Sequence, residues 1–259
     1  MNSLEAAFLG LVQGLTEFLP VSSSGHLVVF RELMGLEQSL FVVVALHAAT
    51  LISVLIFYRH RVLALVGGMA RGDRASWLYV AKLVLATVPV VVLVLLVGDR
   101  LDEPLRSPRV AGLGFVLTGA LLWTTRRTLG AAHGREPGWA AAWWIGCAQA
   151  LAILPGVSRS GSTVAAALAL GVAPAAAAEF SFLMSAVAIA GASVRELARM
   201  GDAGLLVSPG ALALGALAAF GSGLAAIWLF VRVLRTRHFY RFAFYVWAVG
   251  GAFLAWLAF

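Results

Sequence analysis

The chain has 259 residues, of which 61% are hydrophobic and 12% are charged, and its formal net charge is +7. A soluble domain carries about 25% charged residues, so this composition excludes an ordinary soluble protein and indicates one that crosses a membrane several times. Arginine supplies nearly all of the positive charge and falls in short clusters between apolar segments. We therefore attribute the charge to membrane topology and expect no nucleic-acid partner.

About six apolar segments are long enough to cross roughly 30 Å of hydrocarbon. In chain order they are residues 38–58, 77–98, 109–126, 175–194, 209–231 and 239–259. Two further apolar segments, 3–34 and 138–172, are interrupted by proline, glycine and serine. Because neither has a continuous apolar run of about twenty residues, we predict that each is a re-entrant helix–loop–helix element. The expected fold is a single all-α polytopic membrane domain over residues 1–259.

The arginine clusters predict the orientation of this domain. Loops 59–74, 126–136 and 232–241 are rich in arginine, and the positive-inside rule places such loops in the cytoplasm. Both termini then lie outside. The first interrupted segment enters the membrane from outside and the second enters from inside.

The two interrupted segments are related by a shift of 136 residues. "GLVQGLTEFLPVSSSGH", from Gly10, overlays "GCAQALAILPGVSRSGS", from Gly146. Since three spans separate the copies, we predict an inverted-topology repeat with halves at about 1–125 and 138–259. The broken helices of such folds meet near the bilayer midplane and form the site there. The matched pairs are Gly10 and Gly146, Gln13 and Gln149, Leu15 and Leu151, Ser22 and Ser158, Ser24 and Ser160, and Gly25 and Gly161.

The serines of these segments have two interpretations. Serine and glycine are common helix-packing residues in membranes, and one such run alone would favour packing. Irregular backbone at membrane depth, however, is tolerated only where protein or a water-filled cavity surrounds it. Two copies, each after Leu-Pro and each with ionisable neighbours, favour a cavity lined by the serines.

Three ionisable residues of the interrupted segments do not fit the interpretation as solvated loop charges: Glu17, His26 and Arg159. Such residues are costly within a membrane and indicate a functional site, although a lone histidine is more often structural. Gln13 and Glu17 are four residues apart and share a helix face. Their oxygens suit a hard divalent cation, or they orient a neighbouring group.

The second loop has the composition of a phosphate site. The planar guanidinium of Arg159 matches phosphate oxygens, and a helix that starts after this loop would add a favourable dipole. An acid and hydroxyls in one loop and a phosphate cradle in the other suit phosphoryl transfer on a lipid-linked phosphate or diphosphate. No Walker loop is present. The candidate phosphate-binding residues are Ser22, Ser24, Gly156, Ser158, Arg159, Ser160 and Thr163.

The motifs "QGLTEFLPVSSSGHL" and "LPGVSRSGST" resemble the two signature regions of the bacterial undecaprenyl-diphosphate phosphatases of the BacA or UppP type. "LHAATLISVLIFYR", from residue 46, and "AAEFSFLMSAVAIAGA", from residue 177, extend the resemblance over the chain. The resemblance implies an inner-membrane enzyme that hydrolyses undecaprenyl diphosphate to the monophosphate and inorganic phosphate. This reaction recycles the lipid carrier of cell-wall synthesis and confers bacitracin resistance. The resemblance also implies a site open to the outer face and a requirement for Mg²⁺ or Ca²⁺.

The resemblance carries residue roles as well. The acidic motif of the family falls on Gln13 and Glu17 as metal ligands, and Gln13, where many members have glutamate, is the weaker ligand. The functional serine and histidine of the family fall on Ser23 and His26. Three schemes stay open for the attack on phosphorus: Ser23 assisted by Glu17 and His26, a phosphohistidine at His26, or a metal-activated water. The first is preferred.

Two other classes of function remain as alternatives. A transporter or flippase of a polyprenyl phosphate or another anion would use the same inverted-repeat cavity, and a scaffold would bind partners through its loops. The role of Glu179 and the oligomeric state are open, and a homodimer is among the expected partners. A stripe of small residues at Gly215, Ala219 and Gly223, expected to face lipid, indicates close helix packing.

Overall fold

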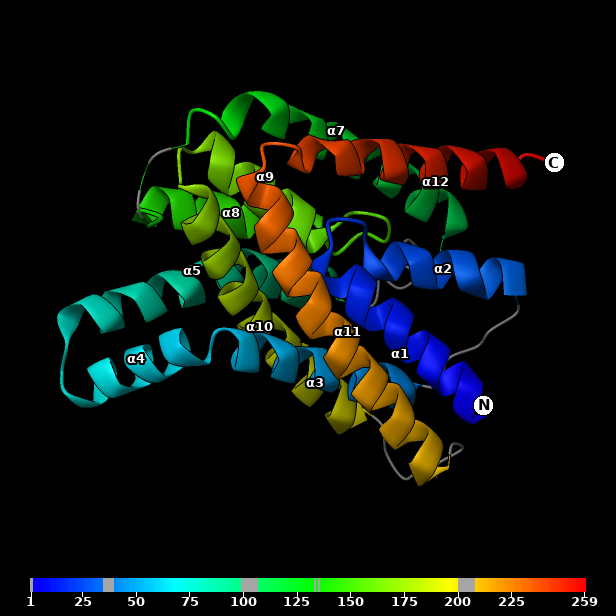
Figure 1. The fold of residues 1–259 in the computed structure, drawn as a ribbon, viewed down its shortest axis with the longest axis horizontal. Coiled ribbons are helices and arrows are strands. Elements are labelled where there is room, and N and C mark those ends of the chain that lie inside the picture. Colours follow the sequence, from blue (N-terminus) through cyan, green and yellow to red (C-terminus); the bar gives the residue numbers. More distant parts are fainter. Residues whose placement is uncertain (1, 35–39, 99–106, 133, 135, 200–207) are drawn as a thin grey trace.

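A computed structural model describes residues 2–34, 40–98, 107–132, 134, 136–199 and 208–259. Regular structure in these residues is helical, apart from one isolated bridge between Gly134 and Val172 (Figure 1). The prediction of an all-α protein is confirmed. The α-helices are α1 (Ser3–Phe18), α2 (Ser23–Met34), α3 (Leu40–Phe57), α4 (Arg59–Ala70), α5 (Arg74–Val97), α7 (Pro108–Thr128), α8 (Trp139–Leu151), α9 (Arg159–Ala169), α10 (Pro174–Arg199), α11 (Pro209–Arg235) and α12 (Phe242–Trp256).

Each of the six expected spans contains a helix, but the helices differ in their capacity to cross a membrane. Among the described residues, α5, α10 and α11 are long and apolar enough, and α3 with α4 forms a fourth candidate bent by 78°. The expected span 239–259 begins with a 3₁₀ turn and leaves 15 residues to α12, or about 22 Å at 1.5 Å per residue. Residues 38 and 39, the expected start of the first span, lie outside the described residues. The chain is a multi-pass membrane protein.

Both interrupted segments form two helices joined by a turn, as predicted: α1 with α2, and α8 with α9. Leu19 ends α1 in an extended conformation (φ −62°, ψ 148°), because a residue that precedes proline is disfavoured in the helical region. The second turn contains Gly156 at φ +83°, which a residue with a side chain rarely adopts. The opposite insertion of the two elements into a membrane stays a prediction.

The two turns share hydrogen bonds at the positions that the sequence shift pairs. The Ser22 Oγ accepts the backbone N–H of Gly25 at 3.2 Å, and the Ser158 Oγ accepts the N–H of Gly161 at 3.1 Å. Each serine thus satisfies an otherwise unpaired donor at the start of the following helix. α2 and α9 therefore begin in the same way.

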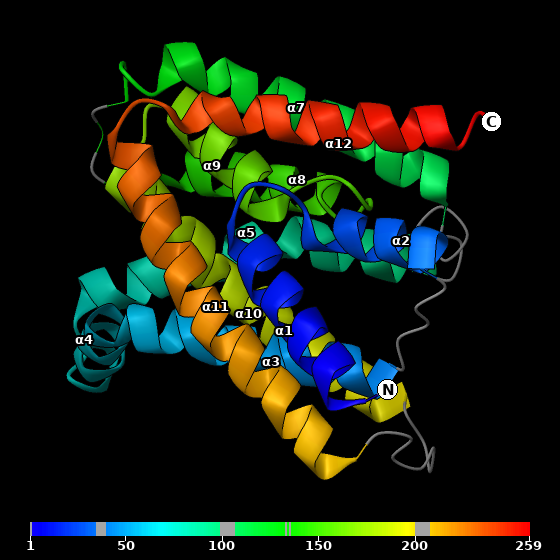
Figure 2. The same ribbon diagram turned by 45° about the vertical axis from the view of Figure 1, so that its right-hand side comes forward.

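The first helix of each element packs against a long helix of the other half, α1 on α11 and α8 on α5. α1 and α11 lie side by side in both views (Figures 1 and 2). A Cβ added to Gly10 would collide with the backbone of Gly215, and one added to Gly146 would collide with the backbone of Ala86. Small residues thus bring both helix pairs to backbone contact, and the paired glycines take equivalent places.

The small-residue stripe on α11 was expected to face lipid, and the structure contradicts this expectation. Gly215 contacts Ala6 of α1, Gly223 contacts Phe18 and Ser53, and Ala219 is fully buried. The stripe faces inward because Gly10 and Gly14 of α1 pack against the backbone of α11, and this close approach requires small residues on α11. It therefore carries no information about a homodimer.

This packing makes a prediction about Gly10. Replacing Gly10 with leucine forces α1 away from α11, and overpacking of this kind costs about 1–3 kcal/mol. We expect a lower midpoint of thermal unfolding in detergent. Gly221→Leu on α11 is the matched control, because a Cβ there meets no heavy atom within 4 Å. Equal midpoints for the two variants would contradict the packing described here.

α7 brings the two turns together. α2 and α9 both pack on α7, and a Cβ added to Gly25 would lie 2.6 Å from the Phe115 ring and 2.7 Å from the Cα of Gly156. The turn after α1 and the turn after α8 therefore touch each other on the surface of α7. On its other side α7 lies along α12 (Figure 2).

Candidate active site

Glu17 is the centre of a cluster that joins both turns. Its side chain lies near the end of α1 and is 2% exposed. The Oε1 atom forms an ion pair with the guanidinium of Arg159, the first residue of α9. The Oε2 atom accepts hydrogen bonds from the Ser23 Oγ at 2.7 Å and from the Gln13 Nε2 at 3.0 Å. Residues 142 positions apart are thus in direct contact through a buried carboxylate.

The backbone of the first turn directs Ser23 towards this carboxylate. Ser22 has φ +66°, an uncommon conformation for a residue other than glycine and one that often marks a functional site. Its buried hydroxyl caps α2, so Ser23 becomes the first residue of the helix. The Ser23 hydroxyl is then free to donate to Glu17.

Two helix N-termini meet at the cluster. α2 begins at Ser23 and α9 begins at Arg159. The first N–H groups of a helix have no intrahelical partner, and the helix dipole places positive charge there. Both ends therefore favour an anion between them, and Arg159 adds a full positive charge.

A cavity of about 600 Å³ opens beside the cluster. One part of its wall is polar. The other part is mostly apolar and consists of side chains from α3, α5 and α10, which also contribute Thr87, Ser193 and Arg195. The polar part includes Thr16, Glu17, Ser22, Ser23, Ser24, His47, Gln149, Ser158 and Arg159. The apolar part includes Val43, Val44, Val90, Val91, Val94, Leu95, Val187, Ala188, Ile189 and Ala192. This arrangement suits a molecule with an anionic head and a hydrocarbon tail.

The structure places the predicted site residues in three groups. Glu17, Ser22, Ser23, Ser24, Ser158 and Arg159 line the cavity. Gln13 lies behind this wall and contacts Glu17. Four predicted residues do not line the cavity and contact other parts of the chain instead: His26, Gly156, Ser160 and Thr163.

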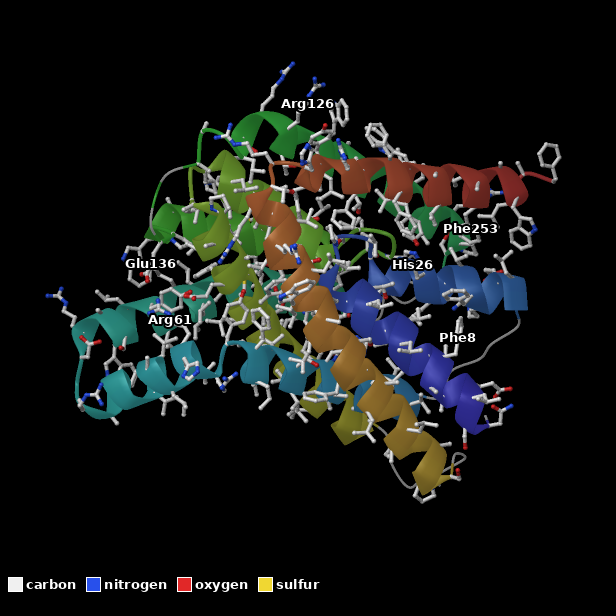
Figure 3. All side chains as sticks on the ribbon, viewed as in Figure 1. Phe8, His26, Arg61, Arg126, Glu136 and Phe253 are labelled. Atoms are coloured by element: carbon white, nitrogen blue, oxygen red, sulfur yellow. The ribbon has the colours of Figure 1, made fainter. Side chains whose placement is uncertain are left out.

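His26 lies on α2 (Figure 3), contacts Tyr245 of α12 and is not among the residues that line the cavity. Its Nδ1 lies 2.8 Å from the carbonyl oxygen of Ser22, and its Nε2 lies 2.9 Å from the hydroxyl of Tyr245. The ring also stacks on Tyr245 and meets Phe115 edge to face. Both ring nitrogens are therefore engaged, and His26 holds the Ser22 turn against α12.

Three residues of the second motif hold Arg159 in place. The Thr163 Oγ1 donates to the carbonyl oxygen of Arg159 at 2.7 Å, and the Ser160 Oγ donates to the carbonyl oxygen of Leu19 at 3.2 Å. The carbonyl oxygen of Gly156 accepts from the Thr118 Oγ1 at 2.8 Å. These contacts fix the start of α9 against the first turn and α7, behind the cavity wall.

His47 also belongs to the cluster around Glu17, although it was not among the predicted site residues. This residue lies on α3, lines the cavity, and places its Nε2 3.8 Å from the Glu17 Oε2. The signal was present, because His47 is an ionisable residue within an expected span. It falls in the segment "LHAATLISVLIFYR", which contributed to the family resemblance.

Glu179, whose role was open, lies in a separate ion cluster. Its Oε1 is 2.9 Å from the Arg61 Nε and accepts a hydrogen bond from the Tyr79 hydroxyl at 3.3 Å. Arg61 also donates to Glu136 at 2.6 Å (Figure 3). Glu179 therefore ties α10 to α4 and α5, away from Arg159.

The donor set at the cluster fits a divalent cation only in part. No group of three His, Cys, Asp or Glu side chains able to hold a metal occurs within the described part of the chain. Glu17 and Ser23 offer oxygens, whereas Gln13 turns its amide nitrogen to Glu17. Since Mg²⁺ is often held by one or two carboxylates together with substrate phosphates, these residues fit a cation shared with a bound diphosphate.

Comparison with known proteins gives full-length matches. The sequence matches the family described as bacitracin resistance protein BacA over residues 6–252. An undecaprenyl-diphosphatase of Desulfosudis oleivorans is 41% identical, with 98% of each chain covered. Proteins of the same name from Alcanivorax borkumensis and Syntrophotalea carbinolica are 39% and 40% identical, with at least 98% of each chain covered. With matches over nearly its whole length, the chain belongs to the BacA family of bacitracin resistance proteins.

Proposed function

We propose that this protein hydrolyses undecaprenyl diphosphate to undecaprenyl phosphate and inorganic phosphate. The observation that carries the proposal is the contact of Arg159 and Ser23 with one buried carboxylate, at the polar end of a cavity with an apolar wall. The names of the full-length relatives support the same reaction. In the cell, this reaction would recycle the lipid carrier of cell-wall polymers and remove the diphosphate that bacitracin binds.

Arg159 and the two helix N-termini bind and orient the diphosphate. Arg159 is paired with Glu17 in the structure, and its guanidinium has further N–H groups with which to hold phosphate oxygens. At the starts of α2 and α9, the N–H groups that Ser22 and Ser158 do not cap would add further donors for this anion. The prenyl chain lies along the apolar wall, where exposed side chains such as Leu95 and Val91 meet lipid.

Ser23 is the preferred nucleophile and Glu17 the base. The Ser23 Oγ attacks the terminal phosphorus while its proton passes to the Glu17 Oε2, the atom to which it is already hydrogen-bonded. The bond between that phosphorus and the bridging oxygen breaks, and undecaprenyl phosphate leaves. Water then attacks the phosphorus of the phosphoserine, and the bond to the Ser23 Oγ breaks. Glu17 returns its proton to that oxygen, and inorganic phosphate leaves with both hydrogens of the water. His26 positions the Ser22 turn, because its ring nitrogens are engaged outside the cavity.

We further propose that the protein lies in the bacterial inner membrane with its cavity open to the outer face. The cavity contacts the C-terminal halves of α5 and α10, up to Leu95 and Arg195. The arginine-rich segment 59–74, which was expected to be a cytoplasmic loop, forms α4 and a short turn in the structure. It precedes α5 and so lies at the opposite end of that helix from the cavity. A bound Mg²⁺ or Ca²⁺, held by Glu17 together with the substrate, would neutralise charge on the phosphates.

Phosphate release tests this function. Purified protein in detergent should release inorganic phosphate from undecaprenyl diphosphate when Mg²⁺ or Ca²⁺ is present. Removal of the cation with a chelator should lower the rate by about 100-fold or more, and its return should restore the rate. A transporter would move the lipid across a vesicle membrane without releasing phosphate. Absence of phosphate release from folded wild-type protein with the cation present would overturn the proposal.

A further inference from the structure

A chain of hydrogen bonds runs from the backbone of α3 to the hydroxyl of Ser23. The His47 Nδ1 lies 2.8 Å from the carbonyl oxygen of Val43, and the His47 Nε2 lies 3.3 Å from the Gln13 Nε2. The same Gln13 nitrogen lies 3.0 Å from the Glu17 Oε2, which accepts from Ser23. Four side chains from three helices are thus linked in series.

The first link fixes the tautomer of His47. A carbonyl oxygen only accepts hydrogen bonds, so the Nδ1 that faces Val43 must carry a hydrogen. In the neutral ring the Nε2 then has a free lone pair and acts as an acceptor. The Nε2 points at Gln13, whose amide nitrogen is the donor that this lone pair requires.

The second link fixes the orientation of the Gln13 side-chain amide. Its NH₂ group has two hydrogens, and the two acceptors within reach are the His47 Nε2 and the Glu17 Oε2. A reversed amide would place its oxygen against the carboxylate and against the His47 lone pair, which leaves both contacts repulsive. Gln13 is also 1% exposed, so water has little access to compensate. His47 therefore determines which atom of Gln13 faces Glu17.

We propose that His47 is a positioning residue, which acts through Gln13 to hold the Glu17 Oε2 against the hydroxyl of Ser23. This role rests on the proposed phosphatase function. The carboxylate has one oxygen on Arg159 and the other shared between Gln13 and Ser23. Loss of the Gln13 bond lets the carboxylate rotate towards Arg159 and weakens its hold on the Ser23 proton. Loss of His47 should therefore slow the chemical step and lower kcat. Substrate binding should not change, because phosphate is bound by Arg159 and the helix N-termini.

A double-mutant cycle on His47 and Gln13 tests this inference. His47→Leu should lower kcat about tenfold, as expected for one lost hydrogen bond that orients a catalytic group, with KM unchanged. In a Gln13→Ala background the same substitution should have no further effect on kcat. His47→Gln should restore most of the rate, because its amide oxygen can accept from Gln13 at the position of the Nε2. His60→Leu, at an exposed position on α4, is the control and should leave kcat unchanged.

The outcomes separate two kinds of failure. An equal loss of kcat from His47→Leu in both backgrounds, or a loss expressed in KM, would show direct contact of His47 with substrate and overturn this inference alone. If His47→Leu lowers the unfolding midpoint as well as the activity, and His47→Gln does not restore the rate, His47 is a packing residue and this inference is wrong. A folded wild type that releases no phosphate would overturn the proposed function and this inference with it.

Discussion

Ser23→Ala should abolish phosphate release, with a fall in kcat of about 10⁴-fold or more, as for other nucleophile deletions. The variant removes only one oxygen, and that oxygen is hydrogen-bonded to Glu17. Ser23 is the first residue of α2, and the cap of that helix comes from Ser22, so the fold should persist. Steady-state phosphate release and the midpoint of thermal unfolding measure the two effects.

Ser24→Ala is the matched control for Ser23. Ser24 also lines the cavity, but its Oγ lies 3.3 Å from the Ser22 Oγ and has no bond to Glu17. We expect a much smaller loss of rate for this variant. A Ser23→Ala protein that keeps most of its activity would favour a metal-activated water. A trapped phosphate that maps to His26 would replace Ser23 with a phosphohistidine.

Arg159→Ala should lower kcat/KM by about 10³-fold, because it removes the permanent positive charge that lies on Glu17 in the cavity wall. Arg159→Lys should recover only part of the loss. Lysine supplies a charge without the planar fork that can hold phosphate oxygens and the Glu17 carboxylate together. Kinetics with undecaprenyl diphosphate at fixed Mg²⁺ measure both variants.

A stability measurement must accompany these kinetics. Glu17 is nearly fully buried, and removal of its partner leaves a buried carboxylate without its ion pair, which is destabilising. Arg159→Lys keeps the charge and should unfold close to wild type, so its loss of activity would not reflect unfolding. Arg127→Ala, at an exposed position on α7, is the surface control. An Arg159→Lys protein with wild-type kcat/KM would show that the planar guanidinium group of Arg159 is not required, and would contradict its role in holding phosphate oxygens.

Much of the site could be predicted from the sequence because its determinants are local. Pro20 and Pro155 mark the breaks, and the serine caps at Ser22 and Ser158 lie where the 136-residue shift pairs them. The prediction that the two loops meet was also accessible, since intramembrane charge requires a partner. Contact between Glu17 and Arg159 satisfies that requirement.

The remainder depends on helix rotation, which sequence letters do not specify. Thr163 and Ser160 belong to the same motif as Arg159, yet their hydroxyls turn to backbone and to Ser181, away from the cavity. The α11 stripe fits lipid or protein equally well by composition, and only the position of α1 decides between them. His47 is an ionisable residue within an expected span, but its distance from both interrupted segments in the sequence does not show that α3 places it beside Glu17.

The most direct test of the central claim is phosphate release from undecaprenyl diphosphate by wild-type protein beside Ser23→Ala and Arg159→Ala, all in the same detergent with Mg²⁺. We expect rapid release by the wild type and almost none by either variant, while the Ser23→Ala protein unfolds at the wild-type temperature. Equal release by all three proteins, or none by a folded wild type, would contradict a phosphatase centre formed where the two turns meet.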